Sequence, residues 1–181
     1  MIKSSTFYVT RKSPSSSWPV SLLEIKQFLR IEHSLEDALL SNLLSIATEY
    51  AEWYMEKSLM PQKWQVSYIR NIPQRIQIPF SPIINVEEVN MITFGYNVNT
   101  IPKDQYFIDD ICSCIVLSRS ISAYRLDIIY QAGYQDISLI PAQIKEGIMH
   151  HVANSYKNRE SSSLDAVKDF YEPFCSLKLV L

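Results

Sequence analysis

The sequence predicts an α+β protein: a helical bundle of two N-terminal and two C-terminal helices with an inserted antiparallel β-sheet region of about six short strands. Two observations support this prediction. Apolar residues recur with a period of about 3.6 near both ends of the chain, whereas between residues 62 and 134 they alternate with polar residues. The connections between the alternating segments are short and contain proline, which favours antiparallel pairing because parallel strands need long crossovers.

The composition is that of an ordinary globular protein, with 181 residues of which 47% are hydrophobic and 20% are charged. A chain of this length buries roughly 70% of the surface that unfolding exposes, so its core needs no disulfide bonds. We expect a single domain over residues 21–173, with helices in 21–61, strands in 62–134 and helices in 141–172. The net charge of −2 creates no field that would draw the whole protein to nucleic acid or to a membrane.

Residues 1–20 are expected to form an extended or mobile arm, because "SPSSSWP" is rich in serine and interrupted by proline. Lys3, Arg11 and Lys12 make this arm basic, and it contains no acidic residue. The arm lacks the apolar run of a signal peptide, and no stretch of the chain approaches the ~20 apolar residues that span a bilayer. We therefore expect a soluble protein made in the cytosol.

The first two helices have recognisable starts. In "PVSLLEIKQFLRI", Ser21 and Glu24 have the spacing of a capping box, and Val20 can pack on Ile25 as a hydrophobic staple. A longer helix follows in "SLEDALLSNLLSIATEYAEWYMEK", for which Ser34 is the expected N-cap.

The long helix carries more apolar residues than a helix packed on one side needs. Its main stripe consists of Leu39, Leu43, Ile46, Ala47, Tyr50 and Tyr54. A second set, Leu40, Leu44 and Ala51, widens this stripe. We therefore expect this second set to contact a neighbouring subunit.

Six segments of the β-region alternate like strands: "KWQVSYIR", "RIQIPF", "NVEEVNMITF", "QYFID", "CIVLS" and "YRLDIIY". After them, Pro141 is suited to the start of a third helix, in which Gly147 is expected to allow a close helix contact. Ser162 or Ser163 is the expected cap of a last helix, which Pro173 breaks or kinks.

Histidine chemistry is not indicated by the sequence. His151 shares a helix face with apolar residues, which predicts a core imidazole bonded to a neighbour. The adjacent His150 points in a different direction, so the two rings cannot share a metal ion.

The remaining candidate side chains also indicate structural rather than catalytic roles. Asp109 and Asp110 are typical of a solvated turn. The spacing of the three cysteines (Cys112, Cys114 and Cys175) is not that of a metal site. Their odd number indicates small buried side chains rather than disulfide bonds. Three glycines are too few for the known phosphate-binding loops. We expect no enzyme activity, no metal and no cofactor.

Three motifs follow one another along the chain. "PVSLLEIKQFLRIEHSLEDALLSNLLSIATEYAEWYMEKSLMPQKWQ" has a Pro-Val-Ser-Leu start, an acidic pair that opens a long helix, and a Trp after a break. "IPKDQYFID" contains a Pro-x-Asp-x-Tyr strand entry, and "AGYQDISLIPAQIKEGIMHHVANSYKNRE" joins a Gly-Tyr turn to a proline-led helix that ends in Asn-Arg-Glu. In order and spacing these motifs, over roughly residues 18 to 160, resemble the head–tail connector proteins of tailed phages. This adaptor or head-completion family is also found in prophages and gene-transfer agents.

The resemblance implies a structural protein. Copies are expected to form a ring, dodecameric like the portal protein on which it docks, although isolated subunits can be monomeric. The ring would extend the channel through which double-stranded DNA leaves the capsid, without binding that DNA specifically. It would also present a surface to a tail-completion or stopper protein. The expected location is the head–tail junction of the virion, after synthesis in the host cytoplasm and with no membrane partner.

Related adaptors use their C-terminal region to grip the portal. The apolar tail, residues 174–181, is therefore the expected portal-binding segment, through Phe174, Leu177, Leu179, Val180 and Leu181. Two alternatives stay open at this point. One is a nucleic-acid-binding module that uses the basic arm around Arg11 and Lys12, and the other is a small enzyme with an unfamiliar site near His151 or Asp109.

Overall fold

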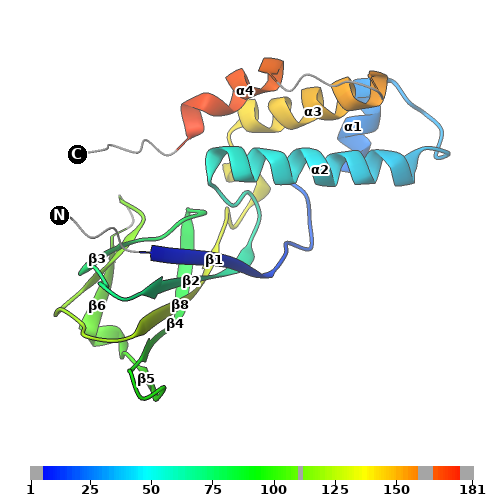
Figure 1. Cartoon of the computed structure of the whole chain (residues 1–181). Helices are drawn as coiled ribbons and strands as arrows, with labels where there is room; N and C mark the ends of the chain where they lie inside the picture. The colour runs from blue at the N-terminus through cyan, green and yellow to red at the C-terminus, as the bar shows by residue number, and fades with distance from the viewer. Residues whose placement is uncertain (1–5, 110–111, 159–164, 176–181) are drawn as a thin grey trace. The chain divides into compact units, whose positions relative to one another are not determined.

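The computed structural model describes residues 6–109, 112–158 and 165–175, and these residues gather around two separate hydrophobic cores. The β unit comprises Met1–Ser15 and Pro61–Gly133, and the helical unit comprises Ser16–Met60 and Tyr134–Leu181 (Figure 1). Residues 21–173, expected to form a single domain, thus contribute to two compact units. Each unit is assembled from two separate stretches of the chain, which a pass along the sequence does not reveal.

The β unit contains two sheets in which every pair of neighbouring strands is antiparallel. The strands are β1 (Thr6–Ser13), β2 (Gln62–Ile69), β3 (Arg75–Gln77), β4 (Ile83–Ile92), β5 (Val98–Thr100), β6 (Tyr106–Asp109), β7 (Cys114–Leu117) and β8 (Arg125–Ala132). Five of them form a sheet in the order β1-β2-β8-β4-β5, and three form a sheet in the order β3-β7-β6. The antiparallel arrangement expected from the short connections is thus present.

The β unit contains two strands beyond the six predicted segments. All six predicted segments contain a strand, and β1 and β5 are additional. Residues of β1 were expected in an extended or mobile arm, and Thr6 to Ser13 are extended but also pair with β2 along the edge of the larger sheet. Phe7 stacks on Tyr68 with ring centroids 5.3 Å apart, and the guanidinium carbon of Arg11 lies 5.7 Å from the ring centroid of Trp64. These contacts give the arm a fixed place that its serine and proline content did not predict.

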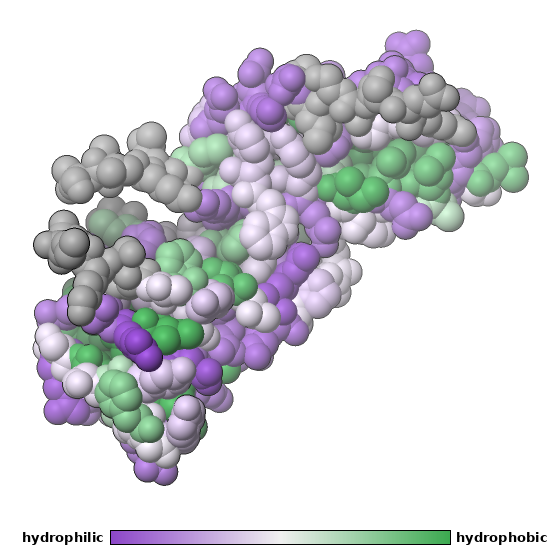
Figure 2. Space-filling view, viewed as in Figure 1, coloured by the Kyte–Doolittle hydropathy of each residue, from purple (hydrophilic) through white to green (hydrophobic). Residues whose placement is uncertain are grey.

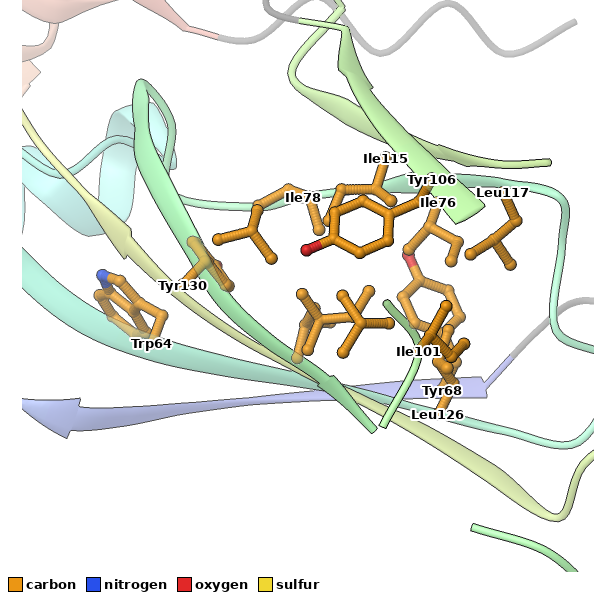
Figure 3. Close-up of a cluster of buried hydrophobic side chains, with 14 of the residues drawn as sticks. Trp64, Tyr68, Ile76, Ile78, Ile101, Tyr106, Ile115, Leu117, Leu126 and Tyr130 are labelled. Atoms are coloured by element: carbon orange, nitrogen blue, oxygen red, sulfur yellow. The ribbon is translucent and has the colours of Figure 1, made fainter. Parts of the chain in front are cut away.

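The core of the β unit lies between the facing sides of the two sheets. Figure 3 shows side chains of the larger sheet, such as Tyr68 and Leu126, directed toward those of the smaller sheet, such as Ile76 and Leu117. The indole of Trp64 stacks on Phe80 with centroids 4.0 Å apart. Burial of these apolar side chains is the main stabilising term of the unit.

The helical unit contains four α-helices within the described residues, in agreement with a mixed α+β fold. They are α1 (Leu22–Leu29), α2 (Asp37–Met55), α3 (Ala142–Lys157) and α4 (Asp165–Tyr171). Short 3₁₀ turns occupy Lys103–Gln105 in the β unit and Ile137–Leu139 and Glu172–Phe174 in the helical unit.

The start of α1 is as predicted, and the start of α2 is two residues later than predicted. The Ser21 hydroxyl accepts a hydrogen bond from the Glu24 amide, and the Glu24 carboxylate accepts one from the Ser21 amide at 2.7 Å. Ser34 does not cap α2, because its carbonyl oxygen accepts from the Asp37 amide in a turn that precedes the helix. The N-cap of α2 is instead Glu36.

A buried carboxylate holds the segment that follows α2. Glu52 is 4% exposed, and its Oε1 accepts a hydrogen bond from the amide of Leu59 at 2.8 Å. The helix itself ends at Met55, where Glu56 adopts the left-handed conformation of a C-cap. The carboxylate therefore fixes the chain between the helix end and the first residue of β2.

Candidate assembly surfaces

The residues that the sequence offered for an enzyme site, His151 and Asp109, have structural contacts. His151 is 3% exposed, and its ring meets Tyr50 edge-on at a centroid distance of 5.2 Å. Burial lowers the pKa of this imidazole below 6.5, so the neutral ring is favoured. The predicted core position is confirmed, but Nδ1 of His151 has no hydrogen-bond partner among the described residues.

Asp109 is engaged in a local network at the end of β6. Its carboxylate accepts from the guanidinium of Arg75 at 2.6 Å and from the Cys112 amide at 3.2 Å. Arg75 also approaches the buried thiol of Cys114, at 3.2 Å from Nε to Sγ. The neighbouring Asp110 lies outside the described residues. The contacts of Asp109 fit a structural turn, as predicted.

Neither metal ligation nor membrane insertion is indicated in the part of the chain that the structure describes. Within those residues, no group of three or more His, Cys, Asp or Glu side chains could hold a metal ion. The helices described there are also too short or too polar to cross a bilayer.

The three residues predicted to contact a neighbouring subunit lie inside the protein's own core. Leu40, Leu44 and Ala51 have no exposed surface and pack with α3 and α4 side chains in the helical unit. They are therefore unavailable to another copy in this structure. The prediction was wrong because α2 has two apolar stripes, and the one assigned to a neighbour is the one that α1, α3 and α4 cover.

A different line of apolar residues on α2 is exposed. Leu39, Ile46 and Trp53 are 37%, 58% and 54% exposed, and they follow one another at intervals of seven residues. This spacing places them along one line of the helix. We call this line the α2 ridge. Figure 2 shows hydrophobic surface over the N-terminal part of α2 and the segment before it.

A shallow apolar groove lies between α3 and α4, with a volume of about 330 Å³. It is lined by His150, Ala153, Asn154, Lys157, Val167 and Phe170. The ring of His150 stacks on Phe170 with centroids 5.1 Å apart, and Phe28 of α1 meets the same imidazole edge-on at 5.2 Å. We call this hollow the α3–α4 groove. Its floor is apolar and its edge carries the basic group of Lys157.

The first residue of the predicted portal-binding tail belongs to the helical unit. Phe174 is partly buried against the helical core, and the thiol of Cys175 lies 3.7 Å from the carbonyl oxygen of Tyr54. The other four predicted tail residues (Leu177, Leu179, Val180 and Leu181) lie outside the described residues.

A family model decides the identity of the chain. The model of the phage gp6-like head-tail connector protein family matches residues 19–125. This match covers more than half of the chain, including α1, α2 and most of the β unit. The chain belongs to this family. The resemblance noted in the sequence is thereby confirmed, and the connector is a structural protein of phage-like particles.

Solved structures with the same fold come from gene transfer agent (GTA) particles. A chain in "Neck of empty GTA particle computed with C6 symmetry" is 16% identical, with a TM-score of 0.80 over 96% of the connector and 97% of that chain. Chains in "Virion of native gene transfer agent (GTA) particle" (14% identity, TM-score 0.78) and "Neck of native GTA particle computed with C12 symmetry" (15% identity, TM-score 0.72) match over 95% and 96% of the connector and over 97% of their own length. No curated protein matches the connector. The structural matches establish a shared fold over nearly the whole length of both chains.

The α2 ridge and the α3–α4 groove were missed as surfaces of the connector. The seven-residue spacing of Leu39, Ile46 and Trp53 is visible in the sequence. The groove has no comparable sequence pattern, because its residues come from two helices whose packing is set by Gly147.

Proposed function

We propose that this connector forms a ring on the portal protein at the head–tail junction of a tailed-phage or prophage particle. The ring extends the DNA exit channel and offers a surface to a tail-completion or stopper protein. The observation that carries this proposal is the family match over α1, α2 and most of the β unit. The fold shared with chains from gene transfer agent particles, two of them from necks named with C6 and C12 symmetry, supports a ring, for which twelve copies are the expected number.

The contact with the portal is assigned to the C-terminal tail. Residues 176–181 have the sequence "SLKLVL", in which four of six side chains are apolar. A short apolar segment at a chain end gains its burial by binding to a partner. Phe174 and Cys175 already contact the helical core, so the assignment to the portal rests on residues 176–181.

The test is portal binding by a tail deletion. Removing residues 176–181, and not Phe174 or Cys175, spares the contacts with the helical core. We expect unchanged circular dichroism and melting temperature but no binding to purified portal rings in a co-sedimentation assay. A matched control replaces Lys178 with Ser and keeps the four apolar residues, and it should bind. Normal portal binding by the deletion variant would refute the role of the tail.

The basic arm offers less support for a nucleic-acid-binding module. Arg11 lies over the indole of Trp64, and β1 is part of the sheet, so this charge is not on a free arm. We expect DNA to pass through the ring without specific contacts. A salt-dependent gel shift of duplex DNA by the isolated subunit, lost on replacing Lys12 with Ala, would favour the alternative.

A further inference from the structure

We propose that neighbouring copies of the connector meet head to tail through their helical units. The α2 ridge of one copy docks in the α3–α4 groove of the next. This inference rests on the proposed ring and specifies the two surfaces that build it.

The ridge has the form of a helix-packing surface. Leu39, Ile46 and Trp53 recur every seven residues and lie on the side of α2 opposite the buried Leu44 and Ala51. A line of large apolar side chains at this spacing is what packs a helix against other helices. Covering three such side chains removes a large apolar area from water, and each fully buried one contributes about 1.5–3 kcal/mol before the costs of association.

The groove lies on the outer side of the neighbouring helix. His150 and Lys157 are seven residues apart on α3, roughly opposite the line of Ile144, Ile148 and His151 that faces the core. Ridge and groove therefore lie on different helices of the unit, each away from the face that its helix turns toward the core. Ala153, Val167 and Phe170 give the groove an apolar floor suited to an apolar ridge.

Charge favours a second copy as the occupant. Glu49 is exposed on α2, between Ile46 and Trp53 in sequence and on the same side of the helix. The edge of the groove carries the cation of Lys157 and the imidazole of His150. The acidic group of Glu49 on the ridge thus matches the cation of Lys157 at the groove, and such complementarity fixes the register of a contact.

A contact between two different surfaces of the same subunit is heterologous. Such a contact repeats from copy to copy and closes into a ring when the rotation per copy permits. A symmetric dimer would instead bring ridge to ridge or groove to groove. The ridge–groove pair therefore suits a ring more than a dimer.

The first experiment is directed cross-linking in the full chain, with the exposed Cys112 replaced by Ser. We expect the double variant Glu49→Cys/Lys157→Cys, assembled on portal rings and oxidised, to give a ladder of covalent multimers on a denaturing gel. Either single variant should stay monomeric on that gel. Dimers from a single variant, which indicate a symmetric contact, or no ladder from the double variant would overturn the proposal.

The second experiment introduces a glutamate in place of an exposed apolar residue at two different sites. Ile46→Glu should lower the yield of rings on the portal by at least about tenfold, which corresponds to about 1.4 kcal/mol per contact. Val98→Glu changes a side chain of similar exposure on β5 and should leave the yield unchanged. Both variants should keep the wild-type melting temperature, because both side chains are exposed.

The outcomes separate the two proposals. If the wild type forms no rings on the portal, the proposed function fails. If the wild type forms rings and Ile46→Glu forms them equally well, only the ridge–groove contact fails. If Ile46→Glu abolishes portal binding while the double-cysteine variant gives no ladder, the ridge is a portal surface and the inference is wrong.

Discussion

Gly147 and Tyr171 approach so closely that a Cβ atom on Gly147 would lie 2.7 Å from Cε1 of Tyr171. The same Cβ would lie 2.8 Å from Cβ of Phe170. Glycine at this position therefore lets α4 pack directly against the backbone of α3, as the sequence predicted. The contact also places Phe170 beside His150 in the α3–α4 groove.

We predict that Gly147→Ala destabilises the helical unit. Alanine is the better helix former by about 1 kcal/mol, but the overlap with two aromatic residues costs about 1–3 kcal/mol and displaces α4. Urea denaturation should show a lower midpoint. Glu146→Ala, at an exposed site on the same helix, is the control and should change the free energy of unfolding by no more than about 0.5 kcal/mol. A more stable Gly147→Ala variant would contradict the close packing.

We predict that His151 makes the stability of the protein depend on pH. Burial lowers the pKa of the folded imidazole below 6.5, so the unfolded chain takes up the proton first as pH falls. Stability should be fully present above pH 6.5 and decrease as pH drops from 6.5 toward the lowered folded pKa, by about 1.4 kcal/mol per pKa unit of lowering.

The measurement is the melting temperature between pH 5 and pH 8 for wild type and two variants. His151→Leu removes the buried imidazole and should flatten the curve between pH 5 and pH 6.5. Met149→Leu changes a nearby side chain that takes up no proton and should keep the wild-type slope. Equal slopes for all three proteins would show that His151 is not the responsible group.

We predict that the carboxylate of Glu52 stabilises the segment between α2 and β2. Glu52→Leu should cost about 1–3 kcal/mol, because the buried amide of Leu59 loses its acceptor. Glu52→Gln retains an acceptor oxygen of the same reach and should recover a large part of this loss. Hydrogen exchange of the Leu59 amide provides the direct readout, with fast exchange expected only in the leucine variant. Unchanged protection in that variant would refute the role of this bond.

We predict that removing β1 promotes aggregation. Deleting residues 1–13 exposes the backbone edge of β2, and an exposed strand edge pairs with other chains. Light scattering should rise during heating at temperatures where the wild type stays clear. Deleting residues 1–5 alone, which precede the strand, is the control. If residues 1–20 were only a mobile arm, both deletions would behave like the wild type.

Local features of the fold were predictable from the sequence, and features set by distant contacts were not. The Ser21–Glu24 capping box and the alternation in β2 depend on residues close in sequence, and both are present. The pairing of β1 depends on β2, which begins 49 positions after the last residue of β1. Its short alternation was outweighed by the serines and prolines that follow it.

The predicted subunit interface was wrong for a related reason. On a helix with apolar residues on two sides, the sequence shows both stripes but not which of them the other helices cover. Leu40 and Leu39 are adjacent in sequence, yet the first is fully buried and the second is exposed. Only the packing of α1, α3 and α4 distinguishes them. The residues assigned to assembly therefore belong to the core, whereas Leu39 and Ile46 of the main stripe lie on the exposed ridge.

The order of strands in the larger sheet has a consequence for biosynthesis. Among the described strands β8 is the last along the chain, yet it lies between β2 and β4. Likewise, α2 is covered by α3, which begins only at Ala142. The core of the β unit therefore cannot close before Ala132 has been synthesised, and the core of the helical unit cannot close before α3 has been made. The apolar side chains of α2 therefore stay uncovered in the nascent chain until α3 is available to pack on them.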